Sequence, residues 1–442
     1  MILIDKKPIF RQKRPVSSPY RMVLWLVLCI GCIFFIREIN LGNVEPFFSP
    51  TRVPTRTSNS FALEGEAHFT SGNLNLAIEA YKKAVALEPN NSKLWSDLAR
   101  TQSYSTTLLT TDAERRERMK EALESIDKGV AVNPDDSTAS ATRAFVLDWS
   151  ASQASDDDTR QSFLTDAEQE AVRALQLDNQ NTLALAYYAE ILVDEQKWLQ
   201  AEQTISQALE RDPTIMDVRR INAYVKESLG FYSEAIAEYE AASKITPNLT
   251  FLYIYTGANL RQLKQYDRAL EYFALAARIN ENLGVKDPIP YLSISKTYSQ
   301  MGEFFPASLN VKKALQYNPD SPDIYGQLGV VYFKSKNYEG SIAPFKCALF
   351  GCSAAESCSV RDCDPQTDES ITIAGMPLTP ATVVYYYTYG SVLAGLHRKS
   401  NPLCEEAVNV LGMVRDRFST DDLIMQIIEP SEEICASYGY TR

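Results

Sequence analysis

The chain has 442 residues, too many for one compact core, so several domains or a repeat array are expected. Its 44 Lys and Arg residues against 56 Asp and Glu give a net charge of −12, which argues against nucleic acid as a partner because phosphates need a basic surface. Only two histidines occur, His68 and His397, and this leaves little material for acid–base or metal chemistry.

The first element expected is a membrane-spanning helix over 22–41, after a basic cytoplasmic tail at 1–21. Residues 22–36 carry no charge, and flanking residues such as Tyr20 and Arg37 can extend this stretch by anchoring at the membrane interface. Basic residues precede the span and acidic ones follow it, so the positive-inside rule places the body across the membrane. A cleaved signal peptide is the alternative, but no typical cleavage site follows residue 36.

A linker is expected at 42–57. Three prolines and several hydroxyl residues fall within 45–60, a composition typical of an extended tether. Such a tether would hold the rest of the chain away from the membrane surface.

A spacing pattern then dominates the chain. Five segments end at a proline with an alanine twelve residues before it and an alanine or glycine five residues before it. Two of these prolines, Pro213 and Pro247, are 34 residues apart, and a fixed period of this kind indicates a repeat fold. The five prolines are Pro89, Pro134, Pro213, Pro247 and Pro319.

This pattern resembles the tetratricopeptide repeat family, whose unit is a 34-residue pair of antiparallel helices. The resemblance implies an all-α solenoid of about eight repeats over 58–350, with a weaker ninth near Pro380. Small residues at positions 8, 20 and 27 would let the two helices approach, and large residues at positions 4, 11 and 24 would fill the remaining space. The first unit matches with Phe61, Gly65, Ala77, Tyr81, Ala84 and Pro89.

Two insertions interrupt the pattern. Units two and three each carry about eleven extra residues between their helices, around 105–116 and 150–163. The second insertion contains Asp156, Asp157 and Asp158, but it lacks the glycine and the distal glutamate of an EF-hand loop. We therefore expect a solvated loop that leads into a helix N-terminus, where acidic residues are favourable.

Cysteines gather near the C-terminus. Two others, Cys29 and Cys32, lie in the predicted span. An even number beyond a membrane predicts disulfides, with fifteen possible pairings, and a zinc site with four cysteine ligands is the alternative. The predicted disulfide cysteines are Cys347, Cys352, Cys358, Cys363, Cys404 and Cys435.

The cysteine-rich stretch at 351–379 is expected to be a stapled insertion loop. Residues 380–442 would follow as a helical repeat and cap, with closing helices at 404–418 and 420–428. Tyr385, Tyr386, Tyr387 and Tyr389 could form a recognition patch, but packing of their helix on the last repeat is the favoured interpretation.

No catalytic residue, metal site or cofactor is predicted, and the protein is not expected to be an enzyme. The chain contains no G-x-S-x-G, Walker A, H-E-x-x-H or G-x-G-x-x-G motif. His68 is expected in the core of the first unit, and His397 at the surface or in a cap.

The resemblance implies that peptides or proteins bind in a concave groove lined by the first helices. By position, candidate groove contacts are Arg220, Tyr224, Phe251, Arg261 and Lys296. The family's clamp for a C-terminal carboxylate uses Lys and Asn at set positions. That clamp is not reproduced here, because the matching places hold Arg220, Tyr224, Tyr255, Ile289 and Ser293.

The sequence therefore predicts a membrane-anchored scaffold that binds protein partners on the extracytoplasmic face. Two alternatives stay open. One is a cytosol-facing receptor for proteins on an organelle membrane, and the other is an accessory subunit of a cell-envelope enzyme complex. The identity of the partner and the oligomeric state are not predicted.

Overall fold

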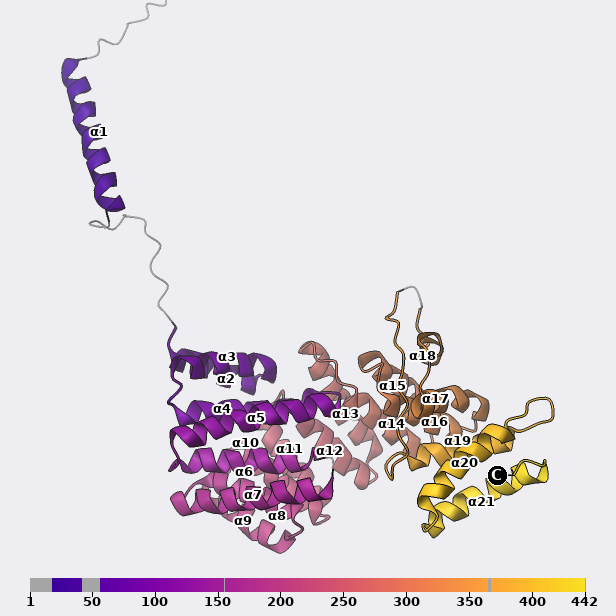
Figure 1. Cartoon of the computed structure of the whole chain (residues 1–442). Helices are drawn as coiled ribbons and strands as arrows, with labels where there is room; N and C mark the ends of the chain where they lie inside the picture. Colours follow the sequence, from indigo (N-terminus) through magenta and orange to yellow (C-terminus); the bar gives the residue numbers. More distant parts are fainter. Residues whose placement is uncertain (1–17, 42–55, 155, 365–366, 442) are drawn as a thin grey trace, which may run out of the picture. The chain divides into compact units, whose positions relative to one another are not determined.

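The computed structural model describes residues 18–41, 56–154, 156–364 and 367–441, and within them it contains helices and no strand (Figure 1). The described residues divide into two parts, one up to residue 56 and one from residue 57. The predicted tail at 1–21 and linker at 42–57 lie almost wholly outside the described residues, so they stay predictions.

Among its described residues, the first part contains one helix, α1 (Pro19–Asn40). A proline at the first helical position suits a helix start, because its missing N–H would have no partner there. From Pro19 to Ile39 the mean hydropathy is 2.3, and none of this apolar surface is buried. At 1.5 Å per residue, a helix of 22 residues reaches about 33 Å, long enough to cross a bilayer core of about 30 Å.

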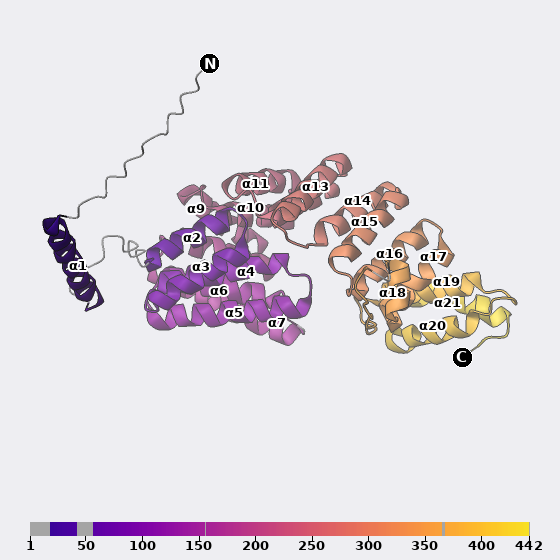
Figure 2. The ribbon, with the colours of Figure 1, turned by 90° about the horizontal axis from the view of Figure 1, so that it is seen from above.

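The second part is a succession of helical hairpins, which we number as units one to nine (Figure 1 and Figure 2). Within each unit the two helices pack against each other, as the sequence predicted. In chain order the units are α2 (Ser58–Thr70) with α3 (Leu74–Leu87), α4 (Ser92–Ser105) with α5 (Asp112–Val132), α6 (Ser137–Ala151) with α7 (Asp157–Leu177), α8 (Thr182–Asp194) with α9 (Trp198–Arg211), α10 (Met216–Ser228) with α11 (Tyr232–Ile245), α12 (Thr250–Gln262) with α13 (Tyr266–Asn282), α14 (Ile289–Met301) with α15 (Phe304–Tyr317), α16 (Pro322–Lys334) with α17 (Tyr338–Phe350), and α19 (Val383–Leu396) with α20 (Cys404–Phe418). Three further pieces are the 3-10 turn η1 (Thr106–Leu108), the short helix α18 (Ala354–Arg361) and the final helix α21 (Asp422–Ser437).

Close approach within the hairpins rests on small residues. A Cβ atom placed on Gly257 would lie 2.5 Å from the Phe273 ring, sixteen residues later, so only glycine fits there. Gly65 and Tyr81 make the same contact in unit one, at 2.9 Å. This is the pairing of positions 8 and 24 that the sequence pattern predicted, and it brings the first and second helices into contact.

The two insertions differ from the prediction of loops. Each of α5 and α7 has 21 residues, against 14 in α9, so most of the extra chain lengthens the second helix. The Asp156 carboxylate accepts a hydrogen bond from the Thr159 backbone nitrogen at 2.8 Å and caps α7. The helix N-terminus predicted at the aspartate triplet is therefore confirmed.

The array curls tightly enough for unit one to contact the start of unit six. Asn248 donates a hydrogen bond from Nδ2 to the carbonyl oxygen of Ser71 at 3.2 Å. The ring of Tyr104 on α4 stacks on that of Phe251 on α12, with centroids 5.6 Å apart. In both views α4 lies beside α10 (Figure 1 and Figure 2). The first helices of units two to six consequently face a shared interior.

The C-terminal region is more regular than predicted. The stretch at 351–379 is not only a loop, because a capping box between Ser353 and Glu356 starts α18 within it. The predicted last helix at 420–428 is too short, since α21 continues through Pro430 to Ser437. Of the four tyrosines considered as a recognition patch, three are buried and pack within the fold: Tyr385, Tyr386 and Tyr389.

The prediction for His68 was wrong, whereas His397 fits the cap alternative of its prediction and not the surface one. His68 is partly exposed beside Glu64, and its neighbour Phe69 fills the core in its place. His397 is buried, and its Nδ1 accepts hydrogen bonds from the backbone nitrogens of Leu403 and Cys404 at 3.1 and 3.0 Å. These two N–H groups belong to the start of α20, so the imidazole caps that helix.

Candidate functional site

A buried polar cluster occupies the shared interior of units two to five. At its centre Asp217, on α10, accepts hydrogen bonds from the guanidinium of Arg100 and from the hydroxyls of Tyr104 and Tyr187, the last two at 2.6 and 2.9 Å. Burial alone would raise the pKa of Asp217, but the adjacent Arg100 charge outweighs it and lowers that pKa to about 2. The carboxylate is therefore ionised and fully paired.

A second ion pair adjoins the first. Arg220, also on α10, donates two parallel hydrogen bonds to Glu190 on α8, both at 2.6 Å. Its guanidinium lies 5.6 Å from the ring centroids of Tyr104 and Trp149, close enough for cation–π contact. Trp149 also donates to Glu190 at 3.1 Å. Side chains of the protein itself thus fill the inner face here, where a peptide or protein partner was expected to bind.

A cavity of about 430 Å³ remains beside this cluster. Both insertions contribute to its wall, together with the first helices of units three to six and the start of α14. The wall is formed by Thr106, Thr107, Arg115, Asp148, Trp149, Ser152, Gln153, Glu190, Asp194, Arg220, Tyr224, Glu227, Tyr239, Thr250, Phe251, Ile254, Tyr255, Asp287 and Ile289.

The cavity wall is acidic. Asp148 is 1% exposed, and no described group donates a hydrogen bond to its Oδ1. The carboxylate of Asp194 accepts a hydrogen bond from the Tyr224 hydroxyl at 2.5 Å. Burial, and then repulsion from Asp194 and Glu190, raises the pKa of Asp148 well above its usual value. Burial likewise raises the pKa of Asp194.

Three of the five predicted groove residues meet at this cavity. Arg220, Tyr224 and Phe251 line it, although Arg220 and Phe251 are themselves buried. Arg261 lies elsewhere, partly buried, and donates to the Ser293 carbonyl oxygen at 3.3 Å. Lys296 is exposed on α14.

Sequence reasoning missed Asp148, Asp194 and Asp217. All three lie on first helices, among residues that pack toward the interior. The sequence did offer one signal for these aspartates. Each is a charged residue on an otherwise apolar helix face, and a buried charge of this kind needs a partner. The partners come from units far apart in sequence, so the pattern within one unit could not identify them.

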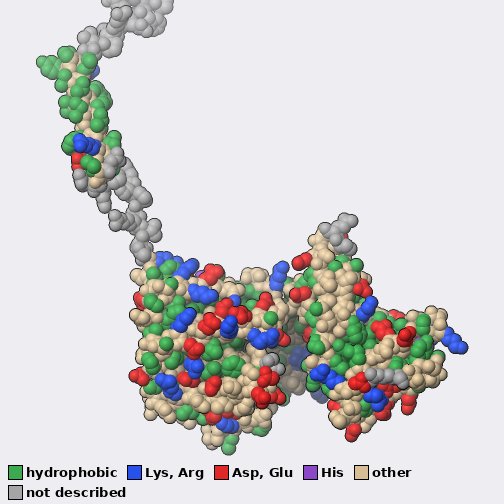
Figure 3. All heavy atoms as spheres, in the orientation of Figure 1, with side chains coloured by type: hydrophobic (Ala, Val, Ile, Leu, Met, Phe, Trp, Pro, Cys, Tyr) green, Lys and Arg blue, Asp and Glu red, His purple; other side chains and the backbone are tan. Residues whose placement is uncertain are grey.

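A second hollow lies between the early and the later units of the array. It has a volume of about 510 Å³. On one side is the insertion of unit two, including Thr111 and Arg115, and on the other are the N-terminal ends of α14 and α16. Met376, from the cysteine-rich stretch, closes one side. Figure 3 shows the surface indented between the early and the later units.

The six C-terminal cysteines form three pairs. Cys347 joins Cys352 and Cys358 joins Cys363, both within the stretch after α17, whereas Cys404 joins Cys435 and ties α20 to α21. Within the described ranges, no set of His, Cys, Asp or Glu side chains is grouped as metal ligands would be.

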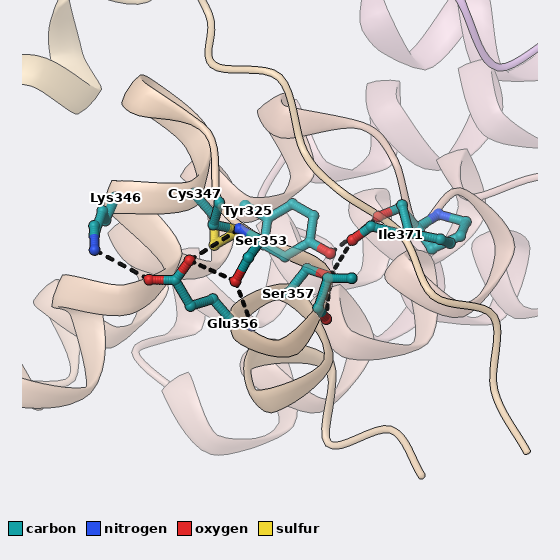
Figure 4. The surroundings of a disulfide bond; sticks show 10 residues. Tyr325, Lys346, Cys347, Ser353, Glu356, Ser357 and Ile371 are labelled. Carbon is teal, nitrogen blue, oxygen red and sulfur yellow. Dashed lines mark hydrogen bonds and ion pairs between the residues drawn. A yellow bond between two sulfur atoms is a disulfide. The ribbon is translucent and has the colours of Figure 1, made fainter. Parts of the chain in front are cut away.

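Hydrogen bonds and an ion pair surround the disulfide between Cys347 and Cys352 (Figure 4). Glu356 accepts hydrogen bonds from the Ser353 backbone and hydroxyl, both at 2.9 Å, and an ion pair at 3.1 Å links it to Lys346. These contacts lower the pKa of Glu356 to about 2. Ser357 donates to the Ile371 carbonyl oxygen and holds the two arms of the stretch together.

Comparison with known proteins gave one family match. Residues 59–91, which span unit one, match a family model described as "Tetratricopeptide repeat". No significant match was found among curated protein sequences.

Solved structures with detectable similarity include three repeat or related proteins. TTC0263, a thermophilic TPR protein of Thermus thermophilus, is 19% identical, with a TM-score of 0.38, over 46% of this chain and 99% of that one. A tetratricopeptide repeat protein of Parabacteroides merdae is 18% identical, with a TM-score of 0.36, over 62% and 98%. MamA is 18% identical, with a TM-score of 0.32, over 36% and 91%.

Proposed function

Because this chain is a tetratricopeptide repeat protein, we propose that it is a membrane-anchored scaffold that holds protein partners on the extracytoplasmic face. The observation that carries the anchoring is α1, an apolar helix with no buried surface ahead of a folded repeat array. Its role is binding rather than catalysis, as is typical of this fold.

The side of the membrane rests on two independent features. Basic residues precede α1, which favours a cytoplasmic N-terminus. Three cysteine pairs lie in the array, and disulfides persist in oxidising compartments. Both features favour an array outside the cytosol.

Partner binding belongs to the later units in this proposal. The interior of units two to five is filled by the ion pairs of Asp217 and Arg220. The hollow beside α14 and α16 has a volume of about 510 Å³ and no comparable filling cluster among its lining residues. Lys296 does not line this hollow, but it is exposed on α14, the helix whose N-terminal end does, and it is a candidate contact for a partner bound to the later units.

Thiol labelling in intact cells tests the location. A membrane-impermeant maleimide is applied with and without prior reduction, and labelled sites are identified by mass spectrometry. The proposal predicts labelling of Cys404 and Cys435 only after reduction and denaturation. Because both residues are buried, labelling of them after denaturation without reduction would show free thiols and would favour the cytosol-facing receptor instead.

Pull-down from the native membrane tests the binding role. The full-length chain, crosslinked in place and solubilised in mild detergent, should retain a discrete protein partner. A catalytic partner among the retained proteins would support the accessory-subunit alternative. Recovery of the chain alone under these conditions would argue against a scaffold.

A further inference from the structure

The cavity of about 430 Å³ has the size and lining of a small-ligand site. Aromatic rings contribute much of its wall, and they come from three different units: Trp149 from α6, Tyr224 from α10, and Phe251 and Tyr255 from α12. Tyr255 is 40% exposed although it lies within this concave region, which leaves its surface free for contact.

Carboxylates on the wall outnumber the cations that could neutralise them. Arg220 is already engaged by Glu190 through two hydrogen bonds. Arg115 donates to the Leu109 carbonyl oxygen at 2.8 Å and pairs with Asp112 outside the cavity. The cationic side chains of the wall thus have other partners, and the remaining acidic residues are Asp148, Asp194, Glu227 and Asp287.

Asp148 is the wall residue whose carboxyl group most needs a positively charged partner. Its carboxyl group is almost fully buried, yet its Oδ1 accepts no hydrogen bond from any described donor. Burying a carboxylate without a partner costs several kcal/mol, so buried carboxyls normally bind a cation, accept hydrogen bonds or hold a proton. Asp194 is the neighbouring carboxyl. It shares a hydrogen bond with Asp148, and its charge opposes ionisation of Asp148.

In the absence of a ligand, a proton fills this role. Because the pKa of Asp148 is raised, its carboxyl group remains protonated above the pH at which an exposed aspartate ionises. A bound cation would remove that need and release the proton. The charged and titratable groups that act on this carboxyl pair are Glu190 on α8, Arg220 and Tyr224 on α10, and Arg160 on α7.

We propose that the cavity binds an organic cation, an ammonium or guanidinium group on an apolar body, with the charge at Asp148 and Asp194 and the body against Trp149 and Tyr255. Aromatic faces attract cations, and carboxylates complete the charge match. An anionic ligand would meet the same acidic wall and be repelled. The ligand can be a free amine or a basic side chain of a partner protein, since both present the same group.

Calorimetric titration of the full-length protein in detergent tests this proposal. The probes are cadaverine, as a free amine, and the blocked tripeptide acetyl-Gly-Lys-Gly-amide, as a protein side chain. Acetyl-Gly-norleucine-Gly-amide, which carries no charge, is the neutral control of similar shape. At pH 8 we expect at least one cationic probe to bind with a Kd of about 1 mM or lower, and the neutral control to bind at least tenfold more weakly. Which cationic probe binds identifies the source of the ligand.

Asp148→Asn is the matched test variant, because it keeps the shape and removes the charge. We expect at least a tenfold loss of affinity for the cationic probe together with a raised melting temperature, since the Asn amide can donate to Asp194. A raised melting temperature would show that the variant folds. Glu210→Gln, at an exposed position on α9, should bind as the unmodified protein does.

Proton release gives an independent readout. Titrations at pH 6 in two buffers of different ionisation enthalpy should give different binding enthalpies for the cationic probe, because the carboxyl pair loses a proton on binding. The proposal is overturned if cationic and neutral probes bind equally, if neither binds, or if Asp148→Asn binds as tightly as the original protein.

Discussion

Arg100 on α4 donates two hydrogen bonds to Asp217 on α10, which lies 117 residues further along the chain. Asp217 is fully buried, and the side chain of Arg100 is only 19% exposed. The contact joins unit two to unit five directly, and the shared interior of the early units is built around it. Removing either charge would leave the other one buried without its ion-pair partner.

Asp217→Ala is therefore expected to lower the free energy of unfolding by roughly 3–5 kcal/mol, the usual cost of breaking a buried ion pair by removing one member. Urea denaturation followed by circular dichroism measures this change. The control is Asp135→Ala, at an exposed aspartate, which should change the free energy of unfolding by no more than about 0.5 kcal/mol. Equal effects of the two substitutions would mean that the buried pair contributes no special stability.

The same carboxylate predicts a pH dependence. Its pKa in the folded protein is about 2, below the value of about 3.9 expected in an unfolded chain, so its stabilising contribution is complete above pH 4 and is lost as the pH falls toward 2. The contribution is roughly 3 kcal/mol, because the pKa differs by about two units and each unit is worth about 1.4 kcal/mol. Denaturation curves between pH 2 and 5 should show a steeper loss of stability for the original protein than for Asp217→Asn. Parallel pH profiles would contradict the assignment.

The contribution of Asp148 to stability should depend on pH in the opposite direction to that of Asp217. Its pKa is raised in the folded protein, so its contribution is greatest below the unfolded value and declines as the pH rises through the folded pKa. Asp148→Asn should therefore stabilise the protein at pH 8 and have a smaller effect at pH 4. Thermal melts at the two values measure the difference, and a larger gain at pH 4 would disprove it.

Gly257→Ala should destabilise the array, because the new methyl group would lie 2.5 Å from the Phe273 ring. Overpacking of this kind typically costs 1–3 kcal/mol, that is, roughly 2 kcal/mol here. Gly395→Ala is the control, since no atom lies within 4 Å of the position of its Cβ and it also lies in a helix. The control should be neutral or slightly stabilising, and a destabilisation similar to that of Gly257→Ala would refute the packing argument.

Removing the disulfide between the final helices should destabilise the protein more than removing a disulfide in the stretch after α17. Cys404 and Cys435 are separated by 31 residues, against five for Cys358 and Cys363. In the loop-entropy account, removing the longer link costs about 3–4 kcal/mol and removing the shorter one about 2 kcal/mol. Thermal unfolding of the two double serine variants compares them, and a larger loss for the short link would contradict the expected order.

Repeat geometry was predictable from the sequence because it depends on contacts within one unit. Gly65 and Tyr81 lie sixteen residues apart in unit one, and the same spacing recurs in later units. The interior site was not predictable in this way. Asp148, Asp194 and Asp217 acquire their environment from the curl of the whole array, which arises from small offsets between units. The extent of α5 and α7 was also missed, because charged helical segments and solvated loops have similar compositions.

The candidate groove residues show the same limit. Arg220 and Phe251 line the inner cavity, but position within a repeat did not reveal that Tyr104 contacts both of them there. Lys296 is exposed, and it belongs to a unit beyond the filled interior.

Site-specific crosslinking at Lys296 tests the central claim, that the later units of an anchored array hold a protein partner. A photoreactive amino acid is introduced at Lys296 in the full-length protein, and at exposed Glu210 on α9 as the control. After irradiation in the native membrane, the account predicts a discrete crosslinked protein from position 296 and none from position 210. No crosslinked protein from position 296, or the same products from both positions, would contradict it.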